Sequence, residues 1–227
     1  MKKILIVGHS HIVALQTAKT VDPTFEFYSI INQQQMDEIS ELDHDNYRSV
    51  IFSIMGNNHN VFGLLNHTQP FDFYFPENLN LPINSNARLL PVNLVAAILR
   101  RNMSSIFTIT SQLLQYFKQP IYQIESPPPI PSELHIQKYP GVFKDKIIEL
   151  GVSPAPFRYK LWRLHSKIVS DNCQRLGISF IDVPTETQDE EGCLQERYWN
   201  TDPTHRNARY GDLVINQIRA IHGMEIK

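Results

Sequence analysis

Cysteine is scarce in this chain of 227 residues. Only Cys173 and Cys193 are present, too few for a disulfide framework, and their separation of twenty residues matches no zinc-binding pattern. The simplest interpretation is a pair of reduced thiols in an intracellular protein.

Long hydrophobic runs are missing as well. The basic pair Lys2-Lys3 precedes four apolar residues, 4–7, in an order that resembles the start of a signal peptide. The sequence "GHSH" (8–11) ends that run, whereas a secretion signal needs roughly 7–15 apolar residues. No later segment approaches the roughly 20 apolar residues of a membrane span. We therefore expect a cytoplasmic protein with no membrane-spanning segment.

Neither charge nor glycine indicates a nucleic acid or a nucleotide. The formal net charge is −2, so no basic surface attracts nucleic acid. After Gly8 the next glycine is Gly56, whereas a dinucleotide fingerprint needs three glycines and a Walker loop needs two and a lysine. We expect no nucleic-acid partner and no cofactor.

What the sequence does contain is an alternation of short apolar runs and helical stretches. Such an alternation forms right-handed crossovers and a parallel sheet covered on both faces, whose chemistry lies at the carboxyl ends of the strands. The expected strands are residues 3–8, 25–31, 49–55, 120–125 and 177–184, and the expected helices are residues 11–21, 92–117, 157–176 and 206–221. We predict one domain over residues 1–227, with irregular insertions near 59–90 and 130–156.

Candidate catalytic residues fall at these strand ends. Ser10 follows the first strand, where Gly8 permits a sharp turn, and its N–H would lie at a helix N-terminus facing a developing oxyanion. A nucleophilic serine needs a base and an orienting carboxylate. Asp202 and His205, three residues apart before the last helix, can present these two groups side by side. Alone, the same pair is also typical of a helix N-cap or a surface pair.

The third strand ends in "MGNNH". Gly56 ends the strand, and the side-chain amide of Asn58 could donate a hydrogen bond to an oxyanion, a contribution of about 10²–10³ in rate. A plain Gly-Asn-Asn turn is the alternative. His9 and His11 also form a His-x-His pair that metal-dependent hydrolases use, but side chains at i and i+2 share a face only in a continued strand. The other histidines show no His-x-x-x-His pair.

In combination and order, these motifs resemble the SGNH (GDSL-type) hydrolases, and "ESPPPI" (125–130) is similar to the proline-rich strand end of that family. The resemblance implies a flavodoxin-like three-layer α/β/α sandwich with a central, mostly parallel five-stranded sheet, and ester hydrolysis without a metal. By this resemblance Ser10 is the nucleophile, His205 the general base and Asp202 its orienting acid. The N–H of Ser10 and the amide of Asn58, with the turn at Gly56, form the oxyanion hole.

The chain departs from the family pattern at two positions. His9 stands where the family usually has aspartate. The family usually takes a third oxyanion donor from a glycine after the second strand, but residues 9–55 contain none. That donor is either another backbone N–H near residues 32–35 or missing, at a cost of about 2.7–4 kcal/mol in barrier.

Aromatic residues follow the proposed oxyanion asparagine. Phe62 and Tyr74 in the segment 60–82 are candidates to line the substrate site, where aromatic rings stack on sugars or enclose an acyl group, and His9, His11 and His59 are candidates to line the crevice. The alternative for the segment is a loop held by its own aromatic cluster.

The sequence therefore predicts an SGNH-type serine esterase acting on a short acyl ester, such as an acetyl group, of a small molecule or a glycan. An O-acyltransferase using the same site, a glycan- or partner-binding domain without turnover, and a metal-dependent hydrolase using the His9/His11 pair are the alternatives.

Overall fold

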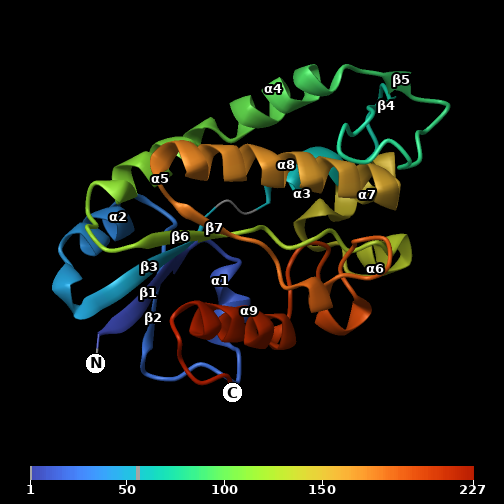
Figure 1. Ribbon diagram of the computed structural model, residues 1–227. Helices are drawn as coiled ribbons and strands as arrows, with labels where there is room; N and C mark the ends of the chain where they lie inside the picture. The colour runs from blue at the N-terminus through green and yellow to red at the C-terminus, as the bar shows by residue number, and fades with distance from the viewer. Residues whose placement is uncertain (1, 55–56) are drawn as a thin grey trace.

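A central sheet of five parallel strands organises the protein. The computed structural model describes residues 2–54 and 57–227. The strands are β1 (Lys3–Gly8), β2 (Phe25–Ser29), β3 (Tyr47–Ser53), β6 (Ile121–Ile124) and β7 (Ser179–Ile181), in the order β2-β1-β3-β6-β7 (Figure 1). This order is the flavodoxin-like one, so the predicted α/β class and parallel five-stranded sheet are confirmed.

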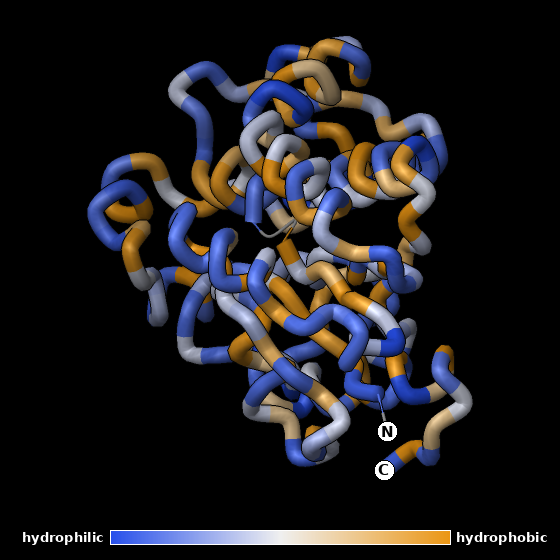
Figure 2. Tube along the Cα trace, turned by 90° about the vertical axis from the view of Figure 1, so that its left-hand side faces the viewer, coloured by the Kyte–Doolittle hydropathy of each residue, from blue (hydrophilic) through white to orange (hydrophobic). Residues whose placement is uncertain are grey.

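Helices cover both faces of the sheet (Figure 1). On one face lie α1 (Ile12–Gln16) and α9 (Ala208–Ile221), and on the other lie α2 (Gln33–Ser40), α4 (Val92–Asn102), α5 (Ser104–Leu114) and α8 (Ala155–Leu176). Side chains alternate along a strand, so Ile4 and Ile6 pack toward α9 while Leu5 and Val7 pack toward α8. Figure 2 shows hydrophobic stretches in the middle of the molecule and hydrophobic and hydrophilic residues in alternation along the outer helices.

Two predicted helices differ from the observed ones. The first, expected over residues 11–21, ends at Gln16, and the Thr17 hydroxyl donates to the Val13 carbonyl in its last turn. The long helix expected over residues 92–117 is two helices, α4 and α5, which meet at Met103 with φ −92° and ψ 0°. The Met103 side chain is fully buried, so the chain bends where this side chain enters the core.

Helix α2 was not expected from the sequence. Its residues are mostly polar, "QQQMDEIS", and its buried face consists of Met36 and Ile39 alone, too short a pattern to indicate a helix by itself. A capping box begins it, in which the Asn32 side chain accepts from the N–H of Gln35 and the Gln35 side chain accepts from the N–H of Asn32. The Asn-x-x-Gln spacing was the available signal.

The two predicted insertions contain short elements of their own. Residues 59–90 include most of α3 (Asn58–Gly63) and the small parallel pair β4 (Phe71–Asp72) and β5 (Arg88–Leu89), and residues 130–156 include α6 (Glu133–Lys138) and α7 (Lys144–Leu150). Single 3₁₀ turns are η1 (His44–Asn46), η2 (Gly141–Phe143), η3 (Thr185–Thr187) and η4 (Glu196–Tyr198). A buried ion pair of 2.5 Å joins Asp72 to Lys160 of α8 and ties the first insertion to the core.

In the described part of the chain, no helix has the length and apolar character to cross a membrane.

Candidate active site

A tight turn after β1 presents Ser10 at the carboxyl edge of the sheet. A Cβ on Gly8 would overlap Ile12 Cγ2 and would lie 2.6 Å from the carbonyl oxygen of Ser53, so only glycine fits here. The N–H of His9 donates to that same carbonyl at 3.3 Å. Ser10 is exposed, and its own N–H has no hydrogen-bond partner within residues 2–54 and 57–227. The N–H of Ser10 is therefore free to donate to a substrate, and the exposed side chain is accessible to one.

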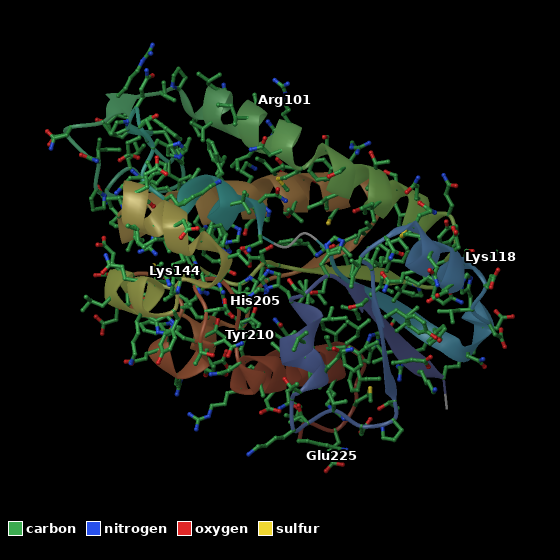
Figure 3. All side chains as sticks on the ribbon, turned by 180° about the vertical axis from the view of Figure 1, so that it is seen from behind. Arg101, Lys118, Lys144, His205, Tyr210 and Glu225 are labelled. Atoms are coloured by element: carbon green, nitrogen blue, oxygen red, sulfur yellow. The ribbon has the colours of Figure 1, made fainter. Side chains whose placement is uncertain are left out.

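The structure brings Ser10, His205 and Asp202 together in one hydrogen-bonded chain. His205 Nε2 lies 2.9 Å from Ser10 Oγ, and His205 Nδ1 lies 3.1 Å from Asp202 Oδ1. With the ring proton on Nδ1, the imidazole donates to the carboxylate and accepts from the serine hydroxyl. This is the arrangement that a serine nucleophile, a general base and an orienting acid require. Figure 3 labels His205 near the middle of the molecule, with Tyr210 of α9 close to it.

Local turn geometry fixes Asp202 relative to His205. Asp202 Oδ1 accepts from the N–H of Thr204 at 2.7 Å and from the N–H of His205 at 2.6 Å, as aspartate does when it closes a turn. Partial burial alone would raise the pKa of the Asp202 carboxyl. Its hydrogen bonds from His205 and from the two N–H groups outweigh burial and hold that pKa below its usual range. The carboxylate is thus ionised beside the imidazole at neutral pH.

A buried arginine supports the loop that carries both residues. The Arg206 guanidinium donates to the carbonyls of Pro127, at 3.1 Å, and of Pro128 and Thr204. An antiparallel bridge between Trp199 and Arg206 closes the base of the same loop. These contacts hold the loop against the proline-rich segment that follows β6. The chain after this second strand therefore helps to position His205.

A cavity of about 240 Å³ opens at the three residues. Four of the residues that line it were not predicted from the sequence: Val13, Ala14, Asn200 and Arg206. The only sequence signal for these four residues was their closeness to the predicted catalytic residues. Val13 and Ala14 follow Ser10 within one helical turn, and Asn200 and Arg206 flank the Asp-x-x-His pair. Val13 is 54% exposed, so it offers an apolar wall to a small group bound beside Ser10.

The two histidines next to Ser10 have separate environments. His9 Nδ1 lies 3.1 Å from the carbonyl oxygen of Ile54, and burial lowers the pKa of the His9 imidazole. His11 lines the cavity, and its ring lies 4.8 Å from the His205 ring, centroid to centroid, with 31° between the ring planes. Burial, with the charge of Arg206, lowers the pKa of His11 to about 3.

The metal hypothesis receives no support from this geometry. Across the residues that the structure describes, no group of three or more His, Cys, Asp and Glu side chains could hold a metal ion. His9 and His11 engage different partners, a carbonyl and an imidazole, as described above.

The predicted oxyanion residues are placed only in part. Gly56 lies outside the described residues. Asn58 is half-buried at the first position of α3, and its side chain makes no hydrogen bond to any other described residue. Near residues 32–35, the N–H groups of Ile31, Asn32 and Gln35 are occupied by the capping box. These three N–H groups therefore do not replace the missing glycine donor.

Of the five predicted lining residues, His11 lines the cavity at Ser10, and the prediction is corrected for the other four: His9, His59, Phe62 and Tyr74. His59 is only 3% exposed and packs on His165 at 4.9 Å between ring centroids. Phe62 contacts His67 and Phe71 in a separate aromatic cluster, with centroid distances of 5.3 and 5.6 Å. Tyr74 is half-exposed and does not line the cavity. Aromatic residues of the segment 60–82 pack on one another instead of lining the substrate site. This was the alternative interpretation of the segment.

Two larger hollows lie over the insertions. One, of about 310 Å³, is bounded by Phe71 and Phe157, and the other, of about 600 Å³, by Tyr159 and the acidic turn 189–191; Pro82 and Pro156 line both. Neither is lined by a residue of the Ser10–His205–Asp202 chain. Size alone does not locate the chemistry of this protein.

Comparison with known proteins identifies the fold. The sequence matches no family profile and no curated protein. Among solved structures, the periplasmic domain of a lipopolysaccharide acetyltransferase from Salmonella ser. Paratyphi A aligns with a TM-score of 0.52 at 13% identity, over 98% of this chain and 84% of that one. A Bacteroides fragilis protein provisionally named an acylhydrolase gives 0.51 at 12% identity, over 98% and 86%. An extracellular lipase from Streptomyces rimosus gives 0.50 at 13% identity, over 99% and 100%. The chain shares its fold with these three proteins, which is consistent with the SGNH hydrolase fold that the resemblance in sequence implies.

Proposed function

We propose that this protein is a serine esterase that cleaves a short acyl ester through an acyl-enzyme on Ser10. The observation that carries the proposal is the hydrogen-bonded chain from Ser10 Oγ through His205 to Asp202, with distances of 2.9 and 3.1 Å. Such a chain on a fold shared with acyl-transferring and ester-cleaving enzymes supports acyl transfer more than any other chemistry.

In the proposed reaction, Ser10 Oγ attacks the ester carbonyl while His205 Nε2 takes the hydroxyl proton. Asp202 stabilises the imidazolium that forms. The oxyanion of the tetrahedral intermediate accepts from the N–H of Ser10 and from the amide of Asn58. His205 returns the proton to the leaving alcohol, and a water molecule then repeats the sequence on the acyl-enzyme and releases the acid.

The acyl group is expected to be small. A cavity of about 240 Å³ with Val13 as its apolar wall matches an acetyl or similar group rather than a long chain, because drug-sized ligands occupy roughly 300–1,000 Å³. We further propose that the alcohol is a carbohydrate hydroxyl, supported by the likeness in fold to a lipopolysaccharide acetyltransferase domain.

Acyl transfer to a sugar hydroxyl is the second candidate function, and the same likeness in fold favours it. The chemistry up to the acyl-enzyme is identical, and only the acceptor differs. The two are separated by offering the acyl-enzyme a carbohydrate acceptor and measuring by mass spectrometry how the acyl group divides between water and sugar.

The proposal is tested with p-nitrophenyl esters of increasing acyl length, on the wild type and Ser10→Ala, each with and without a chelator. The expected result is hydrolysis that is greatest for acetyl, is lost in Ser10→Ala, and does not respond to the chelator. The matched control is Ser105→Ala, which changes an exposed serine of α5. Activity that the chelator abolishes would support the metal-dependent alternative, and no activity on any ester would support a binding domain.

A further inference from the structure

His11 forms the wall between two cavities. One is the cavity at Ser10 and His205, and the other is a small interior cavity of about 20 Å³. The residues that line the interior cavity with His11 include four with hydroxyl or carboxyl groups, namely Ser53, Glu125, Ser126 and Tyr210. The interior cavity and the cavity at Ser10 have His11 in common, and none of the proposed catalytic steps uses the interior cavity.

Two buried polar atoms of this cavity's lining residues lack a partner. His11 Nε2 and Ser126 Oγ are shielded from solvent and make no hydrogen bond to any residue in the described parts of the chain. Ser126 is 6% exposed. Burying a polar group without a partner costs about 1–3 kcal/mol, so a pair of such groups at one cavity indicates a ligand that satisfies both.

The size of the cavity selects the ligand. A cavity must offer roughly 10–15 Å³ to hold one water molecule, which then needs two to four polar partners. The interior cavity offers about 20 Å³, enough for one water and too little for an organic molecule or an oxyanion.

Glu125 supplies a third partner at the same cavity. Its carboxyl group is 5% exposed, and Oε2 accepts from the N–H of Val183 at 2.9 Å. Burial raises the pKa of the Glu125 carboxyl, so this group keeps its proton to a higher pH than an exposed glutamate. In either protonation state it offers an oxygen to a neighbouring water.

We propose that one water molecule occupies the interior cavity, bound by His11 Nε2, Ser126 Oγ and the Glu125 carboxyl group, and that it holds the His11 ring in place against His205. The His11 ring is 4.8 Å from the His205 ring and tilted by 31°, so a fixed His11 restricts rotation of the imidazole that must reach Ser10 Oγ. His11 is thus a positioning residue. This positioning role, unlike the water itself, rests on the proposed function.

The water is tested by crystal structures of the wild type, Ser126→Ala and Ser126→Val at a resolution that shows ordered water. The wild type should show one water within hydrogen-bond distance of His11 Nε2, Ser126 Oγ and Glu125, and the valine side chain should displace it. A wild-type cavity without density, or His11 Nε2 bonded directly to a protein atom, would overturn the proposal.

The positioning role is tested by ester hydrolysis with His11→Phe, which keeps a ring but loses the nitrogen that binds the water. The expected result is a kcat about tenfold lower with KM within about twofold, since displacement of a catalytic group lowers the rate rather than binding. Ser126→Val should lower kcat in the same direction without touching His205. The matched control is His44→Phe, a histidine stacked on Phe117 at 4.8 Å and outside both cavities, which should leave kcat unchanged.

The outcomes separate the two claims. Unchanged kcat in both His11→Phe and Ser126→Val, in folded variants of an active wild type, would overturn the positioning role. A wild type that hydrolyses no ester would contradict the proposed function, and the positioning role would then fall with it. The crystal structures would still decide whether the water is present.

Discussion

Asp202 holds His205 at two points with a single oxygen atom. Asp202 Oδ1 accepts from the backbone N–H of His205 at 2.6 Å and lies 3.1 Å from the ring nitrogen Nδ1. The first contact fixes the position of the His205 backbone, and the second fixes the orientation of its imidazole ring. Nε2 then faces Ser10 Oγ.

Replacing Asp202 by asparagine should separate geometry from charge. Asparagine retains an oxygen that can accept from the backbone N–H of His205, but its amide does not stabilise an imidazolium. We expect Asp202→Asn to lower kcat for ester hydrolysis by about 10²–10⁴, with a melting temperature close to that of the wild type. Glu149→Gln, a change of an exposed carboxylate on α7, is the control. Wild-type kcat in Asp202→Asn would show that the carboxylate is not needed.

At Gly211, helix α9 lies directly against α1. A Cβ at this position would overlap the carbonyl oxygen of Ala14 and would lie 2.7 Å from its carbonyl carbon. Gly211→Ala should therefore lower the free energy of unfolding by about 1–3 kcal/mol, measured by urea denaturation. Because α9 follows the loop that carries His205, kcat should fall as well. If Gly211→Ala had the free energy of unfolding of the wild type, the two helices could move apart at no cost in stability, which would contradict this prediction.

The buried ion pair between Lys160 and Asp72 provides a test of the contact between the first insertion and α8. Both side chains are almost fully buried, and Lys160 Nζ also donates to the carbonyl of Pro82 at 2.9 Å. Lys160→Met leaves the carboxylate buried without its cation, so the free energy of unfolding should fall by about 3–5 kcal/mol. Lys167→Met breaks the exposed pair with Asp171 on the same helix and should cost less than about 1 kcal/mol. Equal effects of the two changes would contradict this account.

Asp22 makes stability depend on pH. Its carboxylate bonds Lys227 at 2.7 Å, Thr24, and Arg219 at 2.6 Å, and these contacts hold the pKa of Asp22 below its usual range. A carboxyl whose pKa is lower in the folded state stabilises the fold above the unfolded value of about 3.9, and this stabilisation is lost as the pH falls through the folded value.

The stability difference between the wild type and Asp22→Asn should therefore be largest at pH 5–7 and shrink steadily below about pH 4. Urea denaturation at a series of pH values measures it. A difference that stays constant down to pH 3 would show that the ionised carboxylate is not the stabilising group.

Much of the fold was predictable because the buried strands carry a strong signal. The run 3–8 and the run beginning at residue 49 are almost wholly apolar, as parallel strands covered on both faces must be. Weakly hydrophobic elements were missed. The helix α2 has polar residues at most positions, and its local signs were the capping box between Asn32 and Gln35 and the short apolar face of Met36 and Ile39.

The candidate site was predictable to the extent that its residues lie at strand ends. Ser10 follows β1, and Asp202 and His205 sit close together in sequence, so their proximity follows from the topology. His59 was not predictable in the same way, because its burial against His165 depends on how α3 packs on α8. The roles of Arg206 and His11 depend equally on tertiary contacts, with the carbonyls of Pro127 and Pro128 and with the ring of His205.

The central claim is that Ser10 is a nucleophile activated by His205, and covalent labelling tests it most directly. The protein is treated with a fluorophosphonate, digested with trypsin, and the peptide of residues 4–19 is examined by mass spectrometry. We predict a stoichiometric adduct on Ser10 in the wild type, none in Ser10→Ala, and labelling slowed by orders of magnitude in His205→Gln. A folded wild type that forms no adduct, or one that is labelled on a different serine, would contradict the account.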